Sequence, residues 1–155
     1  MEFDGRYVIK APRKQVWQAL NDTKVLQEAI PGCERIEWVS KTELEASISV
    51  NLGIMKPTFV GDLALTNVNP AERYTLSGRG RGGILGHAHG AADIILSDHT
   101  TGTFLTFKAA GGVSGQIMRL GKAIVGTSAQ KVIDRFFERF AKAMGAEIML
   151  FDENE

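Results

Sequence analysis

Hydrophobic and polar residues alternate over the first ten positions, with Phe3, Gly5, Tyr7 and Ile9 on one side of an extended segment. This period of two predicts a strand with one solvated face. Two short helices are expected next, because apolar residues then recur at helical spacing. The first ends near residues 21–22 and the second at Pro31-Gly32.

From Glu34 to about Gly112 the alternation is almost wholly strand-like and is broken by turn signals. The residues expected to face inward share one parity on each strand; among them are Leu44, Ala46, Ile48, Val50 and Leu52, then Phe59, Gly61, Leu63 and Leu65, then Tyr74, Leu76 and Gly78. Two further runs lie near residues 86–97 and 101–110. With the opening strand, the pattern predicts seven strands, and the short connections indicate antiparallel pairing.

A long helix is predicted over Ser114 to Met144, which contains no proline and repeats apolar residues at intervals of three and four. Its apolar face rotates at about Gly126, so the helix either kinks or restarts there or curves smoothly. The element order indicates an α+β domain in which a curved antiparallel sheet wraps around this helix and encloses a space. We expect one ligand-binding domain over residues 1–145 and a short acidic tail over residues 146–155.

Eighteen basic residues balance eighteen acidic residues, so no overall field favours nucleic acid as a partner. No apolar run approaches the roughly 18 residues that span a bilayer, and the first ten residues do not resemble a signal peptide. These features predict a cytoplasmic protein. The one cysteine, Cys33, excludes an intramolecular disulfide and is expected to be a small buried thiol.

Chemically reactive side chains are nearly absent from the inward positions. The acids Glu43, Glu45, Asp62 and Asp93 all have outward parity, which argues against catalysis by paired carboxylates. The likeliest metal pair, His87 and His89, also has outward parity, and no third ligand lies nearby in the sequence, so no metal site is expected.

The glycine cluster at residues 78–83 lies between strands, unlike a phosphate-binding loop, which leads into a helix. It is interpreted either as a mobile hairpin or as a place where missing side chains widen a cavity.

Apolar residues predict where a ligand would bind. The expected cavity lining is Ile48, Val50, Phe59, Leu63, Leu65, Leu76, Leu105, Phe107, Ile117, Leu120 and Ile124, of which about half should be ordinary core. Apolar residues at turns, namely Ile54, Met55, Ile84, Leu85 and Met118, either anchor their loops or form a rim around that cavity.

The final helix has a basic face with two interpretations. It carries Arg119, Lys122, Lys131, Arg135, Arg139 and Lys142. In its second half these side chains point away from the phenylalanines, which describes either a solvated surface or a face that contacts an anionic membrane or an acidic protein.

Several local motifs carry a family resemblance: Ala11-Pro12 leading to Val16-Trp17 and Leu20-Asn21-Asp22, then Ile30-Pro31-Gly32-Cys33, and the glycine-rich strand from Gly78. In these and in its element order the chain resembles CoxG, the G subunit of carbon monoxide dehydrogenase, within the superfamily of START, Bet v 1 and polyketide-cyclase-like (SRPBCC) helix-grip domains. The resemblance covers residues 1–145 and implies an accessory role beside a molybdenum hydroxylase of the carbon monoxide dehydrogenase or xanthine dehydrogenase type. It also implies recruitment of that enzyme to the inner face of the cell membrane, a quinone held in the cavity, and no catalytic residue or tightly bound cofactor. Relatives often have a longer C-terminal extension for membrane contact, so contact here is expected to be peripheral or through the partner.

Three functions are therefore under consideration. The leading hypothesis is a non-catalytic carrier of a quinone-like or lipid-like molecule. A small cyclase or hydrolase is the second, and it requires at least two titratable side chains that converge inside the cavity. The third is a protein-docking module whose interior is filled by its own side chains.

Overall fold

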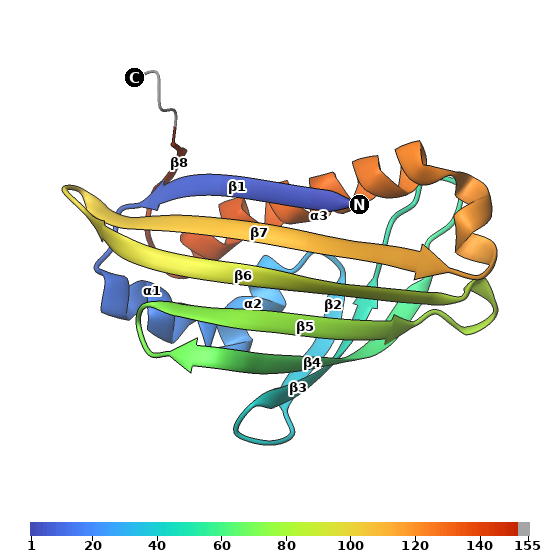
Figure 1. Ribbon diagram of the computed structural model, residues 1–155, viewed down its shortest axis with the longest axis horizontal. Helices are drawn as coiled ribbons and strands as arrows, with labels where there is room; N and C mark the ends of the chain where they lie inside the picture. The colour runs from blue at the N-terminus through green and yellow to red at the C-terminus, as the bar shows by residue number, and fades with distance from the viewer. Residues whose placement is uncertain (152–155) are drawn as a thin grey trace.

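One curved antiparallel sheet wraps around a long helix in the computed structural model, which describes residues 1–151 (Figure 1). The strands are β1 (Glu2–Ile9), β2 (Cys33–Trp38), β3 (Glu43–Ser49), β4 (Thr58–Asn69), β5 (Arg73–Arg81), β6 (His87–His99), β7 (Gly102–Ser114) and β8 (Ile148–Leu150). The helices are α1 (Arg13–Leu20), α2 (Thr23–Ala29) and α3 (Lys122–Ala143), and two short 3₁₀ turns are η1 (Gly83–Leu85) and η2 (Gln116–Leu120). The predicted helix-grip class is confirmed, including the two short helices after the first strand.

The strands follow the order β2-β3-β4-β5-β6-β7-β1-β8 across the sheet. Long hairpins form its middle, and β1 returns to pair with β7 along its whole length, from Glu2 opposite Ala110 to Ile9 opposite Thr103. Because α2 packs on α3 and on β2, the two short helices close one side of the space between sheet and helix. This arrangement leaves a long apolar interior.

The described part of the chain has eight strands instead of the seven predicted. The additional strand β8 pairs with the outer edge of β1, with Ile148 opposite Ile9 and Leu150 opposite Tyr7. Three residues are too few for alternation to be recognised, and a free strand edge attracts a further strand. The predicted acidic tail over 146–155 thus begins as part of the sheet, and its last four residues lie outside the described part.

The final helix breaks at Gly121, and no break occurs at Gly126. Gly121 has φ 86° and ψ 154°, values outside the helical region, and separates η2 from α3. Gly126 lies inside the uninterrupted helix Lys122–Ala143. The break explains the different direction of Ile117, which belongs to η2, whereas Val125 and Phe140 are both buried on the continuous helix α3.

Aromatic side chains join the sheet to α3. Tyr7 of β1 stacks on Phe137 with ring centroids 4.3 Å apart, and Phe107 of β7 lies 5.1 Å from the same ring. Phe140, one helical turn further on, is fully buried. Burial of this many aromatic rings supplies a large part of the apolar area that stabilises the domain, at about 25 cal/mol per Å².

Candidate functional site

An apolar cavity of about 290 Å³ lies between the sheet and α3. Its walls come from α1, α2, the sheet and α3: Leu20, Leu26, Ile30, Ile36, Trp38, Leu44, Ile48, Leu63, Leu65, Tyr74, Leu76, Ala92, Ile94, Leu105, Phe107, Ala109, Val132, Ile133, Phe136 and Phe137. None of these residues carries a carboxylate, imidazole, amine or thiol. The Trp38 indole N–H donates to the Asn21 carbonyl oxygen at 3.2 Å, which satisfies one of the few polar groups in the lining.

The cavity continues toward one end of the sheet as a second space of about 480 Å³. The two spaces share residues of the sheet and of α3, including Ala92, Ala109 and Val132. Together they form what is here called the apolar trough. Its combined size suits a ligand of tens of heavy atoms, because small-molecule pockets typically measure roughly 300–1,000 Å³.

A row of small residues creates the second half of the trough. In the sheet register Gly78 of β5 lies opposite Gly90 of β6, which lies opposite Gly111 of β7. All three line the trough, so three adjacent strands contribute no side chain at this level. Only Gly78 of this row belongs to the glycine cluster, and a Cβ atom there would lie 2.7 Å from Leu63 Cδ2, so the row does not decide between the two interpretations of the cluster.

Two neighbouring glycines have a different role, since their missing side chains make room for a ring on the adjacent strand. A Cβ atom on Gly82 would lie 2.8 Å from Phe59 Cε1, and one on Gly80 would lie 3.4 Å from Phe59 Cβ. The Phe59 side chain of β4 thus packs over these positions. The side chains of Leu63 and Phe59 thus occupy the space beside Gly78, Gly80 and Gly82.

Tyr74 supplies the polar group deepest in the trough. Its side chain is 6% exposed, and its ring meets the Trp17 ring edge-on at 5.4 Å. No partner for the hydroxyl is present within residues 1–151. Burial raises the pKa of Tyr74 well above its ordinary value, so the hydroxyl stays protonated and can donate a hydrogen bond to a ligand.

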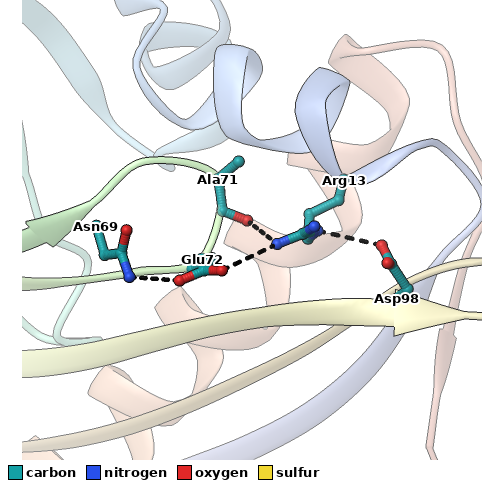
Figure 2. Close-up of polar contacts among 5 residues, drawn as sticks. All are labelled: Arg13, Asn69, Ala71, Glu72 and Asp98. Carbon is teal, nitrogen blue, oxygen red and sulfur yellow. Dashed lines mark hydrogen bonds and ion pairs between the residues drawn. The ribbon is translucent and has the colours of Figure 1, made fainter.

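An arginine network closes the end of the domain beside Tyr74 (Figure 2). Arg13, at the start of α1, donates from Nε to Asp98 Oδ1 at 3.1 Å and from a terminal nitrogen to the Ala71 carbonyl at 3.1 Å. The Glu72 carboxylate lies 3.9 Å from the guanidinium and also accepts from Asn69. One side chain thus joins α1 to the β4–β5 turn and to the end of β6.

The opposite end carries exposed apolar residues on three short connections. Ile54 lies between β3 and β4, Ile84 in η1 and Met118 in η2, and they are 84%, 85% and 60% exposed. Met55 and Leu85, their neighbours in the predicted rim, are half-buried. The turns that carry these residues come together at the end of the sheet where α3 begins (Figure 1).

A groove between α3 and the residues around the β3–β4 connection, here called the basic cleft, measures about 640 Å³. Its cations are Lys56, Lys131, Arg135 and Arg139, and its lining contains no carboxylate. Val132 lines both the basic cleft and the apolar trough, so the two spaces adjoin there.

The structure distributes the predicted lining residues among several places. Six lie on the 290 Å³ cavity, namely Ile48, Leu63, Leu65, Leu76, Leu105 and Phe107. Phe59 lines the extension, whereas Val50 and Ile124 line the basic cleft. Ile117 and Leu120 belong to η2, and neither appears in the lining of the trough or the cleft, because the helix proper begins only after Gly121.

Sequence reasoning missed lining residues on the short helices and on α3, such as Leu26, Ile30, Ile133 and Phe136. It also missed Ala92 and Ala109, whose inward parity was a usable signal. The α3 residues repeat at helical intervals that mark a buried face, but spacing alone does not separate a cavity wall from a filled core.

Among the remaining reactive side chains, His89 lines the 480 Å³ half of the trough, whereas His87 and Cys33 line neither half. His87 and His89 are exposed on β6, and within residues 1–151 no three His, Cys, Asp or Glu side chains gather as a metal site would require. Cys33 is half-buried, and burial raises the pKa of its thiol. A protonated thiol is a poor nucleophile.

In the part of the chain that the structure describes, no helix combines the length and the apolar character needed to cross a bilayer.

Comparison with known proteins places the domain in a family. A sequence model of CoxG, the G subunit of carbon monoxide dehydrogenase, matches residues 5–145. No match was found among curated proteins. A conserved protein from Geobacillus kaustophilus superposes with a TM-score of 0.82 at 23% identity, covering 94% of this chain and 99% of that one.

Two more distant structures share the architecture. The ZhuI aromatase/cyclase from Streptomyces sp. R1128 has a TM-score of 0.64 at 14% identity, with 93% of both chains covered. Ara h 8.0201 has a TM-score of 0.63 at 12% identity, with 93% of this chain and 97% of that one covered. At these identities the likeness concerns the fold alone.

Proposed function

The chain belongs to the CoxG family, named for the G subunit of carbon monoxide dehydrogenase, and we propose that it is a non-catalytic accessory protein that holds a hydrophobic, quinone-like or lipid-like molecule in the apolar trough. The observation that carries the proposal is a cavity of about 290 Å³ whose twenty lining residues include no acid, base or thiol that titrates near neutral pH. Such a lining excludes water and selects apolar ligands.

Apolar burial supplies the binding energy. A ligand that loses about 300 Å² of apolar surface gains roughly 7 kcal/mol at 25 cal/mol per Å². Loss of translational and rotational freedom offsets a large part of this gain. A net affinity in the micromolar range, about 8 kcal/mol, therefore requires more buried area or polar contacts with the ligand.

Tyr74 would orient the bound molecule. Its protonated hydroxyl lies among apolar side chains, so a ligand that places a carbonyl oxygen there would accept a hydrogen bond from it. A quinone offers a flat apolar ring with carbonyl oxygens on its edge. This chemistry favours a quinone over a plain hydrocarbon.

The partner in this proposal is a molybdenum hydroxylase of the carbon monoxide dehydrogenase or xanthine dehydrogenase type. The support is the family to which the chain belongs. The exposed side chains of Ile54, Ile84 and Met118 would contact the membrane surface, because apolar tips on adjoining turns are suited to shallow insertion. Membrane contact would thus be peripheral and would occur at the end where α3 begins.

The test begins with freshly purified protein. Native mass spectrometry and solvent extraction should recover an apolar molecule, and the emptied protein should take up a decyl-substituted benzoquinone. Uptake is measured by quenching of Trp38, which lines the cavity. A Trp38→Phe variant serves as the control, because it removes the cavity signal and keeps Trp17. Failure of both extraction and quenching would contradict the proposal.

The cyclase alternative has one supporting observation, the fold shared with an aromatase/cyclase. Acid–base catalysis needs groups that exchange protons near neutral pH. Tyr74, with its raised pKa, does not. The lining therefore favours binding over turnover, and the cavity volume argues against a docking module with a filled interior.

A further inference from the structure

The basic cleft gathers four cations without an opposing carboxylate in its lining. Lys131, Arg135 and Arg139 follow one another at intervals of four along α3, and Lys56 faces them from the β3–β4 connection. Hydroxyl groups of Ser49, Thr127 and Ser128 line the same groove. Cationic and hydroxyl donors in one concave surface form an environment for an oxyanion.

Four cations elsewhere on the protein have carboxylate partners. Lys10 lies 3.1 Å from Glu147, Arg13 pairs with Asp98 and Glu72, Arg35 with Glu37, and Arg81 lies 3.8 Å from Asp62. Within the described residues, the four cations of the cleft have neither an ion pair nor a side-chain hydrogen bond. The cleft thus gathers four cations without ion pairs into one concave lining that contains no carboxylate.

The acids of α3 lie on its other flank. Asp134 accepts a hydrogen bond from Gln130 at 2.9 Å, and together with Glu138 it helps raise the pKa of Tyr7, after the larger effect of burial. Charge is therefore segregated around the helix. Cations spaced by four residues repel one another at a cost of about 0.2–0.5 kcal/mol per pair, and a bound anion would remove this repulsion.

The neighbouring apolar trough indicates what kind of anion belongs there. Val132 separates the cleft from the trough and lines both. We propose that the ligand is an anionic amphiphile whose phosphate head occupies the basic cleft while its apolar chain enters the trough past Val132. This inference rests on the proposed function and specifies the ligand class.

The experiment uses three probes with the emptied protein: decyl phosphate, 1-decanol and inorganic phosphate. Calorimetry measures each affinity at low salt and at about 0.5 M salt. Decyl phosphate should bind about tenfold or more tightly than decanol at low salt, and the advantage should shrink at high salt as the head contacts are screened. Inorganic phosphate should bind more weakly than decyl phosphate because it has no chain to bury.

The variant is Lys131→Gln/Arg135→Gln, which removes two cations from the cleft. It should abolish most of the advantage of decyl phosphate and leave the affinity for decanol unchanged. The matched control is Lys14→Gln/Lys142→Gln, with the same change in net charge at exposed positions outside the cleft. This control should keep the advantage.

The outcomes separate the two proposals. Equal affinities for decanol and decyl phosphate would overturn the head-group site and leave the carrier function intact, whereas failure of both to bind would overturn the carrier function as well. The head-group site would also be wrong if inorganic phosphate bound as tightly as decyl phosphate, or if the control variant lost the same advantage. Displacement of decyl phosphate by a polyglutamate peptide of higher affinity would assign the cleft to an acidic protein.

Discussion

The two ends of the apolar trough are built in opposite ways. At the end beside α1, Arg13 connects three elements through hydrogen bonds and ion pairs (Figure 2). Tyr74 packs against Trp17 at the same end. At the other end Ile54 and Ile84 are exposed, and from there the basic cleft runs along α3 as far as Arg139 with no carboxylate in its lining. Hydrogen bonds and ion pairs hold the first end, here called the tied end. The second, here called the open end, has exposed apolar side chains and adjoins cations without carboxylate partners.

The difference indicates where stability and binding reside. Groups that already have partners contribute to the fold, whereas unpaired charges and exposed apolar tips lower stability slightly and are available to a ligand or a surface. Substitutions at the tied end should therefore change folding, and substitutions at the open end should change binding. Each of the following experiments tests this division.

The largest effect is expected from Ala92→Phe, in the middle of the trough. Ala92 lines both halves, so a ring there should block the ligand and lower affinity at least ~30-fold, or about 2 kcal/mol. Stability should change little, because the ring enters open space. Quinone quenching of Trp38 and urea unfolding measure the two effects.

The control for this substitution is Ile95→Phe on the exposed face of the same strand, which should bind normally because Ile95 lines neither half of the trough. Loss of stability in Ala92→Phe by about 1–3 kcal/mol would instead indicate a filled core, and unchanged binding would place the ligand elsewhere.

Tyr74→Phe should change the response to alkaline pH. Burial raises the pKa of Tyr74 in the folded state. Above about pH 10 the unfolded chain therefore loses the hydroxyl proton while the folded chain keeps it, and the free energy of unfolding falls as the pH rises. By about pH 11 this costs the wild type about 1.4 kcal/mol. The variant should lack that loss of stability. A smaller dependence of the free energy of unfolding on pH should remain, because the pKa of Tyr7 is also raised.

Urea titrations at several pH values measure this difference. Parallel stability curves for the two proteins above pH 10 would show that the hydroxyl is solvated, and they would remove Tyr74 from the trough.

Arg13→Ala should lower the free energy of unfolding by about 1 kcal/mol, since it leaves the Ala71 carbonyl and the Asp98 carboxylate without their donor. Binding of the quinone should not change. Arg135→Ala at the open end is the matched comparison, with a change in stability within about 0.5 kcal/mol. Equal losses in the two variants, measured by urea unfolding, would contradict the contrast between the ends.

The smallest expected effect has the opposite sign. Lys131→Gln should stabilise the ligand-free protein by about 0.2–0.5 kcal/mol, because it removes repulsion from Arg135 one turn away. Thermal unfolding should show the gain at low salt and not at about 0.5 M salt, where exposed charges are screened. A loss of stability at both salt concentrations would mean that the cation has a structural partner.

Much of the fold follows from periodicity. Inward parity on β3 and β4 placed Leu44, Leu63 and Leu65 correctly, since a half-buried strand must alternate. Periodicity did not predict β8, whose three residues pair with the free edge of β1. It also did not locate the break before α3, which lies at Gly121. Gly121 and Gly126 look alike in a sequence, and only the positive φ of Gly121 separates them.

The candidate site was predictable only in part. Strand parity identified most of the sheet's contribution to the trough, but Ile117 and Leu120 were assigned to a helix face that they do not share. The basic cleft joins residues about 75 positions apart in the sequence, such as Lys56 and Lys131. The spacing of basic residues predicted the basic face of α3. It could not predict the groove without carboxylates beside that face, because the groove depends on how distant segments pack.

The glycine row across β5, β6 and β7 has a consequence for ligand choice. In this row Gly111 is fixed by crowding, because an added Cβ would lie 2.5 Å from the His89 carbonyl oxygen, whereas the nearest atom to a Cβ on Gly90 would be 3.3 Å away. Gly90 is thus the position of this row where an added methyl group needs the smaller adjustment, a shift of a few tenths of an ångström between it and the Ala110 carbonyl, and there it would shorten the accessible trough. The size of the side chain at position 90 would then set the length of ligand that the trough accepts. The residues that stabilise the domain would not need to change.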